Sequence, residues 1–184
     1  MHLFEVDIPN TQNLNKSDVL SAGDEITTFE YEGTKIGIGI CHDLCFPEMA
    51  HLMSKQGCSL LVYPGAFSVT LGAEHCTLLA RSRASDEQLW VALASPARGG
   101  AACSEGGRSM LVDPRAAVVA HLDYNPQTFI ADIDLNLVEE VRSYIPIRIQ
   151  RIDAYNTVHM KSFCTSRASS YVGSMIKRYG VCNL

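Results

Sequence analysis

The sequence predicts an α/β fold in which strands and helices alternate, so that helices cover one face of a sheet. Three stretches support this prediction. Residues 35–41 alternate isoleucine with glycine, which is the period of a strand. Residues 46–56 have helical apolar spacing, with Pro47 near the first turn and Gly57 beyond the last. Residues 58–63 form a continuous apolar run of the kind found in a buried strand.

The remaining elements continue this order along the chain. We expect strands over 26–31, 89–94, 109–113, 117–121 and 128–133, and helices over 73–87 and 135–144. The spacing of the first of these two helices predicts that Leu78, Leu79, Ser82 and Ala84 share one side. Asp134 is placed to cap the second helix, and Pro146 to end it.

Length and composition limit the classes of protein that fit. A chain of 184 residues suits one domain with a sizeable core, and 47% hydrophobic with 19% charged residues is ordinary for a globular protein. The net charge of -5 argues against nucleic acid and against an anionic membrane as partners. No apolar run is long enough to span a membrane.

Compartment is predicted from the cysteines and from the first residues. Seven cysteines are an odd number, irregularly spaced, which favours reduced thiols over a disulfide framework. The first residues show no basic segment followed by an apolar one, so no secretory signal is visible. We therefore expect a cytoplasmic protein, with a mitochondrial location left open.

Cys41 occupies the place of a nucleophile. It stands at the expected end of a strand, just before a helix, where backbone N–H groups can face a developing oxyanion. The alternative is a small buried residue, because free cysteine is among the most buried residue types.

The residues around Cys41 resemble a known motif. Gly-Ile-Cys-His-Asp at 39–43, with Phe-Pro-Glu at 46–48, is similar to the nucleophile motif of the nitrilase, or carbon–nitrogen hydrolase, superfamily. Further segments resemble the omega-amidase branch in order and spacing, at 2–4, 63–67, 81–84 and 94–98. The similarity extends from residue 1 to about residue 155.

The resemblance implies a fold and a domain division. The family fold is an α-β-β-α sandwich, and this chain resembles its C-terminal part, with the N-terminal strands and helices missing. We expect a partial carbon–nitrogen hydrolase domain over 1–160 and a tail of unknown structure over 161–184. Family members pair through their helices, so the resemblance also implies a homo-oligomer.

The resemblance also implies an activity. Family members hydrolyse non-peptide C–N bonds through a cysteine nucleophile and a thioester, here Cys41, without a cofactor or a metal ion. The omega-amidase branch acts on small dicarboxylic keto-acid monoamides such as 2-oxoglutaramate. Tyr63, Phe67 and Thr70 correspond to the loop that lines the substrate pocket, although strand-end packing would also explain Tyr63 and Phe67.

This sequence departs from the family pattern at its catalytic partners. The catalytic Glu and Lys of the family have no counterpart here, and the second Glu of the family falls at or beside Lys16. Relatives often carry Arg where Cys45 stands. Two hypotheses therefore stay open, an omega-amidase-like enzyme and a catalytically inactive remnant or partner protein that keeps the scaffold.

Several neighbours of Cys41 allow a second role. A Cys41–His42 dyad is disfavoured, because successive strand side chains point to opposite faces and His42 should turn away from the thiol. Cys41 and Cys45 could form a metal or redox pair, but further ligands are not nearby in the sequence, so a substitution at Cys45 is the better explanation. Asp43 could orient the loop backbone or simply form a turn.

The other polar residues near the motif have structural explanations. Glu48 is expected to stabilise the helix start rather than act as a base. We expect His75 to be a packed or surface histidine. Arg81 and Arg83 are expected to be structural ion-pair partners on their helix.

Overall fold

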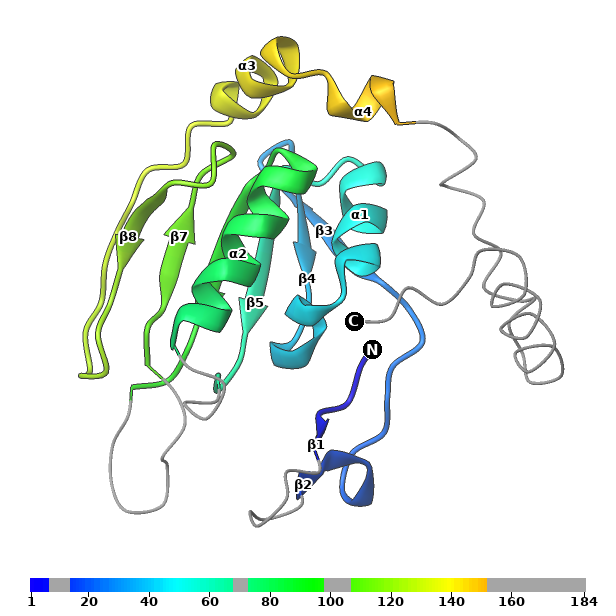
Figure 1. Ribbon diagram of the computed structural model, residues 1–184, viewed down its shortest axis with the longest axis vertical. Coiled ribbons are helices and arrows are strands. Elements are labelled where there is room, and N and C mark those ends of the chain that lie inside the picture. Colours follow the sequence, from blue (N-terminus) through cyan, green and yellow to red (C-terminus); the bar gives the residue numbers. More distant parts are fainter. Residues whose placement is uncertain (7–13, 68–72, 98–106, 152–184) are drawn as a thin grey trace, which may run out of the picture. The chain divides into compact units, whose positions relative to one another are not determined.

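The structure, a computed structural model, describes residues 1–6, 14–67, 73–97 and 107–151. The chain divides into two compact units, Met1–Pro146 and Ile147–Leu184. Helix α4 (Ile147–Gln150) is the only described element of the second unit. All other elements belong to the first unit, which contains a six-stranded sheet (Figure 1). The expected domain limit at residue 160 lies outside the described residues and stays a prediction.

The sheet has the strand order β3-β4-β5-β6-β7-β8. Strands β4, β5 and β6 are parallel to one another, and the other neighbouring pairs are antiparallel. Two short strands, β1 (Glu5–Val6) and β2 (Leu14–Asn15), pair separately. The bounds of the six strands are Thr27–Tyr31, Thr34–Ile38, Leu60–Pro64, Trp90–Ala94, Met110–Val112 and Val118–His121.

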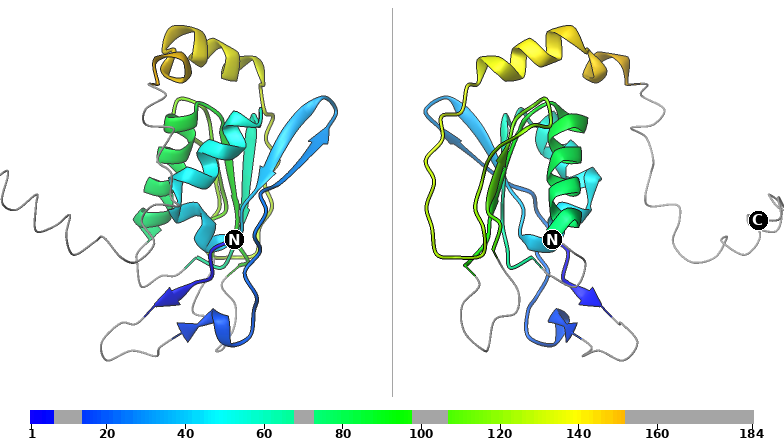
Figure 2. Two further views of the ribbon diagram at one scale, coloured as in Figure 1. Left: turned by 90° about the vertical axis from the view of Figure 1, so that its right-hand side faces the viewer. Right: turned by 60° about the vertical axis from the view of Figure 1, so that its left-hand side comes forward.

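Two helices connect the parallel strands and cover one face of the sheet, as expected (Figure 2). Helix α1 (Pro47–Lys55) leads from β4 to β5, and α2 (Ala73–Glu87) leads from β5 to β6. Helix α1 has Pro at its first position, which suits a residue without an N–H group. Gly57 follows the helix with φ +95°, a conformation that favours glycine.

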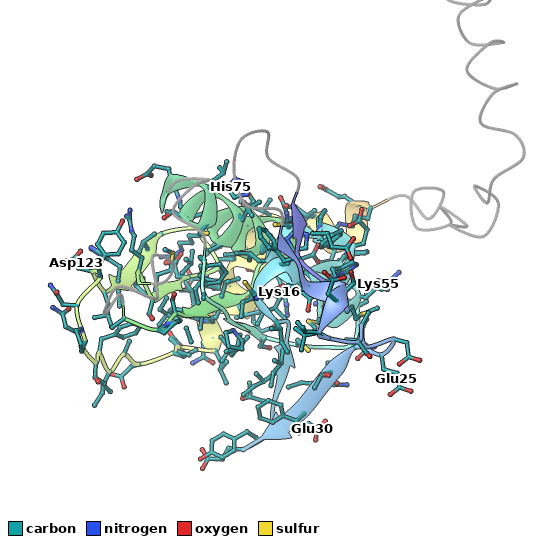
Figure 3. All side chains as sticks on the ribbon, turned by 90° about the horizontal axis from the view of Figure 1, so that it is seen from below. Lys16, Glu25, Glu30, Lys55, His75 and Asp123 are labelled. Carbon is teal, nitrogen blue, oxygen red and sulfur yellow. The ribbon has the colours of Figure 1, made fainter. Side chains whose placement is uncertain are left out.

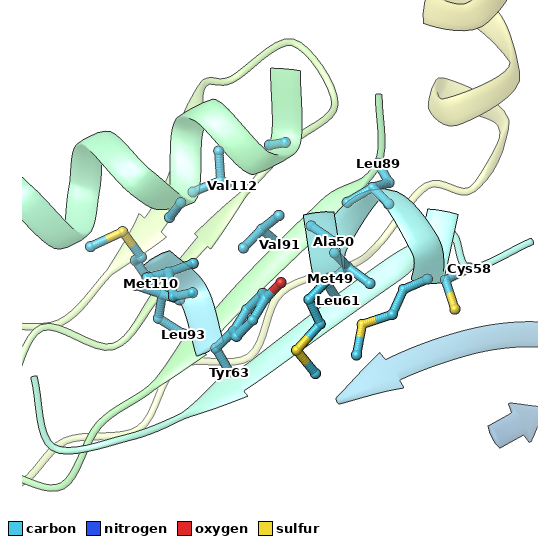
Figure 4. Packing of buried hydrophobic residues seen from close by; sticks show 14 residues of the cluster. Met49, Ala50, Cys58, Leu61, Tyr63, Leu89, Val91, Leu93, Met110 and Val112 are labelled. Atoms are coloured by element: carbon cyan, nitrogen blue, oxygen red, sulfur yellow. The ribbon is translucent and has the colours of Figure 1, made fainter. Parts of the chain in front are cut away.

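The main core lies between this sheet face and the two helices. Leu61, Tyr63 and Val91 alternate with outward residues along their strands and are fully buried (Figure 4). The glycines of the β4 region allow this packing. A Cβ on Gly37 would stand 2.7 Å from Leu61 Cδ2, and a Cβ on Gly39 would stand 2.5 Å from the Tyr63 ring. Gly37 and Gly39 therefore let Leu61 and the Tyr63 ring pack directly against the backbone of this segment.

The opposite side of the sheet is also apolar, and we call it the second face. Strand register places these residues on it: Phe29, Tyr31, Ile36, Ile38, Leu60, Val62, Trp90, Ala92, Leu111 and Ala120. Helix α3 (Asn136–Tyr144) covers part of it with Leu137 and Val138, which pack in one cluster with Trp90. The Trp90 indole N–H donates to the Asp134 carbonyl at 3.0 Å.

Three expectations about local structure are wrong. The segment 128–133 is not a strand, since no described strand pairs with it and Ile130 is 95% exposed. Leu78 is 62% exposed and does not share a side of α2 with Ala84, which is buried together with Ala80. Strand β4 ends at Ile38, so Cys41 does not end a strand.

Helix α3 begins one residue later than predicted, at Asn136, and its N-cap residue Leu135 makes no side-chain capping hydrogen bond, but Asp134 still contacts the helix start. The Asp134 carboxylate accepts the Asn136 N–H at 2.9 Å. Within the described residues, we find no helix that is both long and apolar enough to cross a membrane.

Candidate active site

Cys41 begins a short 3-10 helix, η2 (Cys41–Cys45), that turns the chain from β4 into α1. Its φ is +48°, in the left-handed region that a residue with a side chain rarely adopts. Strained backbone of this kind persists only where its surroundings hold it, and it is found preferentially at functional sites. The turn places Cys41 beyond the carboxyl end of β4, beside the end of the parallel strand β5.

Asp43 holds this turn together. Its side chain is almost fully buried and accepts the Ile40 N–H at 2.9 Å and the His2 N–H at 2.8 Å. It also contacts His2 Nδ1 at 2.8 Å and the Met1 ammonium at 3.2 Å. Of the two roles weighed for Asp43, orientation of the loop backbone is therefore present, within a turn.

Hydrogen bonding decides the charge state of Asp43. Burial by itself raises the pKa of this carboxyl, but the N–H groups of Ile40 and His2, the His2 ring and the terminal ammonium outweigh burial, and the pKa is lowered. Asp43 is therefore ionised at neutral pH, as an acceptor of several N–H groups should be.

Cys41 lines a pocket with a cavity volume of about 300 Å³, at the small end of the range for ligand sites. The pocket is surrounded by Phe4, which precedes β1, and by residues of η1 (Lys16–Asp18), η2, the end of β5 and α2. Its lining consists of Phe4, Lys16, Ile40, Cys41, His42, Leu44, Cys45, Gly65, Ala66, Phe67, His75, Cys76 and Leu79.

The end of β5 approaches Cys41 very closely. The Cys41 thiol donates to the Ala66 carbonyl at 3.9 Å. A Cβ on Gly65 would stand 2.6 Å from Cys41 Cα and 3.0 Å from Cys41 Sγ. We call the turn at Cys41 the elbow. Only a residue without a side chain fits beside the elbow, so Gly65 forms one wall of the pocket.

The polar lining of the pocket is basic. Lys16, His42 and His75 contribute their side chains, and no carboxylate belongs to the lining among the described residues. Lys16 and His75, both labelled in Figure 3, come from the separate elements η1 and α2. His75, expected to be a packed or surface histidine, is half-buried in the pocket lining, and its role stays a prediction.

His42 lies beside Cys41 in η2, and both residues line the pocket. The argument that strand alternation separates their side chains is wrong, since neither residue is in a strand. The His42 ring makes edge contacts with the rings of Phe4 and Phe46, and in each pair the ring centroids are 5.3 Å apart. Burial, and then the neighbouring His2, lower the pKa of His42, while Asp43 opposes them. His42 is therefore a neutral imidazole at neutral pH.

The three residues predicted to bind substrate have different positions. Phe67 lines the pocket. Tyr63 is fully buried in the core, where burial raises the pKa of its hydroxyl, and it is not part of the pocket lining. This placement favours the packing role for Tyr63. Thr70 lies outside the described residues, so its role stays a prediction.

Arg83 and Glu48 have the structural roles expected for them. The Arg83 side chain is buried, donates to the Leu44 carbonyl at 3.3 Å and pairs with Asp86 at 3.3 Å. It therefore ties α2 to η2. Glu48 is exposed in the first turn of α1, where a carboxylate stabilises the helix, and it is not part of the pocket lining.

Sequence reasoning did not identify Cys76 as a pocket residue. Its helix was predicted correctly, but nothing in the sequence indicates which face of that helix turns toward Cys41. The signal that was available was weak, a cysteine next to His75 in the first turn of a helix that follows the Tyr-Pro-Gly loop.

The fold and this elbow define a class of protein. Residues 1–143 match the family described as carbon-nitrogen hydrolase, and the chain belongs to that family. This confirms both the resemblance seen in the sequence and the α/β fold expected from it.

Sequence relatives within the family are omega-amidases. Omega-amidase NIT2 of Xenopus tropicalis is 45% identical over 164 residues, which cover 88% of this chain and 59% of that protein. Omega-amidase NIT2 of Homo sapiens is 43% identical over 163 residues, with coverage of 88% and 59%. The chain therefore spans about three fifths of the length of these curated relatives.

Solved structures support the same fold. Saccharomyces cerevisiae Nit3, a member of branch 10 of the nitrilase superfamily, superposes with a TM-score of 0.68 at 39% identity, over 71% of this chain and 49% of that chain. The C. elegans NitFhit protein superposes with a TM-score of 0.77 at 32% identity, over 84% and 38%.

Proposed function

We propose that this chain is an omega-amidase-like hydrolase of small dicarboxylic keto-acid monoamides such as 2-oxoglutaramate. The observation that supports the proposal most directly is Cys41, held at φ +48° in a turn that lines a pocket. Omega-amidase relatives at 45% identity support the class of substrate. The positive charge of Lys16, with no carboxylate in the described lining, suits a substrate that carries carboxylates.

The reaction would proceed through a thioester. The Cys41 thiolate attacks the amide carbonyl carbon, and a tetrahedral oxyanion forms. The C–N bond then breaks, and the nitrogen leaves as ammonia after it gains a proton. Water attacks the thioester, and the carboxylate product leaves as the thiol is restored.

Two histidines are the proton acceptors within the described pocket. His42 is neutral at neutral pH, which an acceptor must be, and it adjoins Cys41. His75 lies across the pocket on α2. Lys16 provides a positive charge, which would stabilise both the thiolate and the oxyanion. His42, His75 and Lys16 would thus supply part of what the family obtains from the Glu and Lys that this chain does not match.

The test is ammonia release from 2-oxoglutaramate by the purified chain. We expect turnover that the Cys41→Ala variant abolishes. Cys58→Ala is the matched control, because Cys58 is fully buried and is not part of the pocket lining. Turnover that Cys41→Ala retains would show that Cys41 is not the nucleophile, and the proposal would be wrong.

A second candidate is a catalytically inactive scaffold that binds partners. The observation that favours it is the pocket lining, which contains no carboxylate among the described residues and hence no counterpart of the family's Glu base. General-base assistance is worth about 10²–10⁴-fold in rate. If ammonia release by the chain equals that of Cys41→Ala at every substrate concentration, the scaffold is the better description.

A further inference from the structure

Three cysteines line the pocket, and one of them, Cys76, is distant from the other two in the sequence. Cys41 and Cys45 are the first and last residues of η2, and Cys76 lies in the first turn of α2. We call these residues the thiol cluster. None of the three is in a disulfide. The proposed amide hydrolysis needs one thiol, so the other two have no part in it.

Packing between η2 and α2 holds the thiol cluster together. The two elements contact each other directly, and the Arg83–Leu44 hydrogen bond lies at the same junction. Cys76 is close enough to the other two thiols to sense their charge. Burial first, and then Cys45 and Cys41, raise the pKa of Cys76 to about 11, against the opposing effect of Arg108.

The environments of Cys45 and Cys76 differ from what a reactive thiolate needs. Burial also raises the pKa of Cys45, against Arg83. Both residues are therefore protonated thiols at neutral pH, and a protonated thiol reacts poorly with an oxidant. Such a thiol can still condense with an oxidised neighbour, because a sulfenic acid is a strong electrophile for thiols.

We propose that the thiol cluster is an oxidative modification site, in which a peroxide oxidises Cys41 and Cys76 then closes a Cys41–Cys76 disulfide. The ligand of the site is a small hydroperoxide, and hydrogen peroxide fits a cavity of about 300 Å³. The disulfide would join η2 to α2 across the pocket.

The atoms and electrons balance in two steps. The Cys41 sulfur attacks one peroxide oxygen, the O–O bond breaks, and a sulfenic acid and one water form after proton transfer. The Cys76 sulfur then attacks the sulfenic sulfur, the S–O bond breaks, and the hydroxyl leaves as a second water. Overall, two thiols lose two electrons and two protons, and one peroxide is reduced to two waters.

A metal site is a weaker explanation for the thiol cluster. Among the described residues, no group of three or more cysteine, histidine or acidic side chains has the geometry to hold a metal ion. Cys45 is the other possible partner of Cys41, but both lie in one five-residue helix. Cys76 comes from a separate element and can approach without a change inside the turn that Asp43 closes.

The disulfide would act on the pocket reversibly. It would consume the Cys41 thiol and place two sulfur atoms inside the cavity, so substrate would be excluded. Thiol reductants would restore the site, because a disulfide is the reversible product of thiol oxidation. A peroxide signal would thus stop the reaction without permanent damage to Cys41.

The test uses the full chain, reduced and then treated with a small excess of hydrogen peroxide without denaturant. Free thiols are blocked by alkylation, and trypsin then releases residues 36–55 and 56–81, with two cysteines each. We expect these peptides to be joined, with a mass lower by two hydrogens than their sum, and to separate on reduction. Mass spectrometry detects this product whether or not the chain hydrolyses an amide.

Four variants assign the bond. The joined peptide should be lost in Cys41→Ala and in Cys76→Ala, and it should keep its yield in Cys45→Ala and Cys58→Ala. Circular dichroism checks that each variant is folded. Three results would overturn the proposal: a joined peptide that persists in Cys76→Ala, a joined peptide that disappears in Cys45→Ala, and sulfinic acid at Cys41 without any joined peptide.

Discussion

Gly65 is the residue that brings the end of β5 against Cys41, and its substitution is a direct steric test of the pocket. A Cβ there would lie 2.6 Å from Cys41 Cα and 2.7 Å from Cys41 Cβ. Both are parts of the elbow that cannot rotate away. We therefore expect Gly65→Ala to lower the free energy of unfolding by about 1–3 kcal/mol, the usual cost of overpacking. Urea denaturation of the parent chain and of Gly65→Ala measures this difference in unfolding free energy.

Gly23→Ala is the matched control for that substitution. A Cβ on Gly23 would have no atom within 4 Å, and Gly23 is exposed. Its unfolding free energy should stay within about 0.5 kcal/mol of the parent chain, as for ordinary surface changes. If Gly65→Ala behaved like Gly23→Ala, the elbow could not be as close to β5 as the structure places it.

Asp43 gives a prediction about pH. Its pKa in the folded chain is lowered, so its ionised form stabilises the fold above the unfolded pKa, about 3.9 for an aspartate. This contribution is lost as pH falls through the lower, folded value. Asp43→Asn should therefore cost about 1–3 kcal/mol at pH 7, because a buried acceptor of several N–H groups loses its charge.

The difference between the two chains should shrink as pH falls below about 4, where the parent aspartate also becomes neutral. Chemical denaturation at a series of pH values follows this difference. Asp24→Asn serves as the control, since Asp24 is exposed. A cost for Asp43→Asn that stays constant down to pH 2 would mean that the charge of Asp43 contributes nothing to the turn.

At the residue scale, the sequence predicts which residue stands at the elbow better than it predicts how that residue is held. Cys41 and Asp43 are found from a local motif, because the chain itself carries the turn. The positive φ of Cys41 and the approach of Cys76 depend on packing between segments far apart in the sequence. No local pattern records such packing.

At the element scale, helix α1 follows directly from its sequence signals, and its end can be tested at Gly57. A Cβ on Gly57 would meet no atom within 4 Å, so substitution there tests backbone strain alone. With φ at +95°, Gly57→Ala should cost about 1–2 kcal/mol. Gly57→Asn should cost less, because asparagine tolerates left-handed backbone. Thermal unfolding ranks the parent chain, Gly57→Asn and Gly57→Ala by stability. Equal stabilities would contradict the assigned helix end.

Elements with local signals were predicted well, and those that depend on a partner were not. Helix α2 begins and ends where expected, β6 lies within its apolar run, and β5 extends one residue beyond its run, to Pro64. The segment 128–133 has the composition of a strand, but a strand also needs a neighbour with free hydrogen-bonding groups. No described strand pairs with this segment, which instead packs through Phe129 and Ile133 against the cluster that contains Trp90.

For the first unit as a whole, the second face is the main apolar surface that the fold leaves partly uncovered. Its β6–β7 part is covered, since Trp90 and Leu111 are buried. Its β3–β5 part is not, because Ile36, Ile38 and Val62 are only half-buried and Phe29 is 44% exposed. A contiguous apolar surface of this kind promotes association. Strand β3 also stands at the sheet edge, with one side free to pair in the described sheet.

We therefore expect this chain, purified alone, to self-associate through the second face. Phe29→Ser should shift sedimentation-velocity profiles toward the monomer, since it replaces an exposed ring with a polar group at no cost to the main core. Leu78→Ser is the matched control, because Leu78 is 62% exposed on α2, on the other side of the sheet. If Leu78→Ser dissociates the assembly and Phe29→Ser does not, the chains associate through their helices instead. A parent chain that stays monomeric at all concentrations would contradict both arrangements.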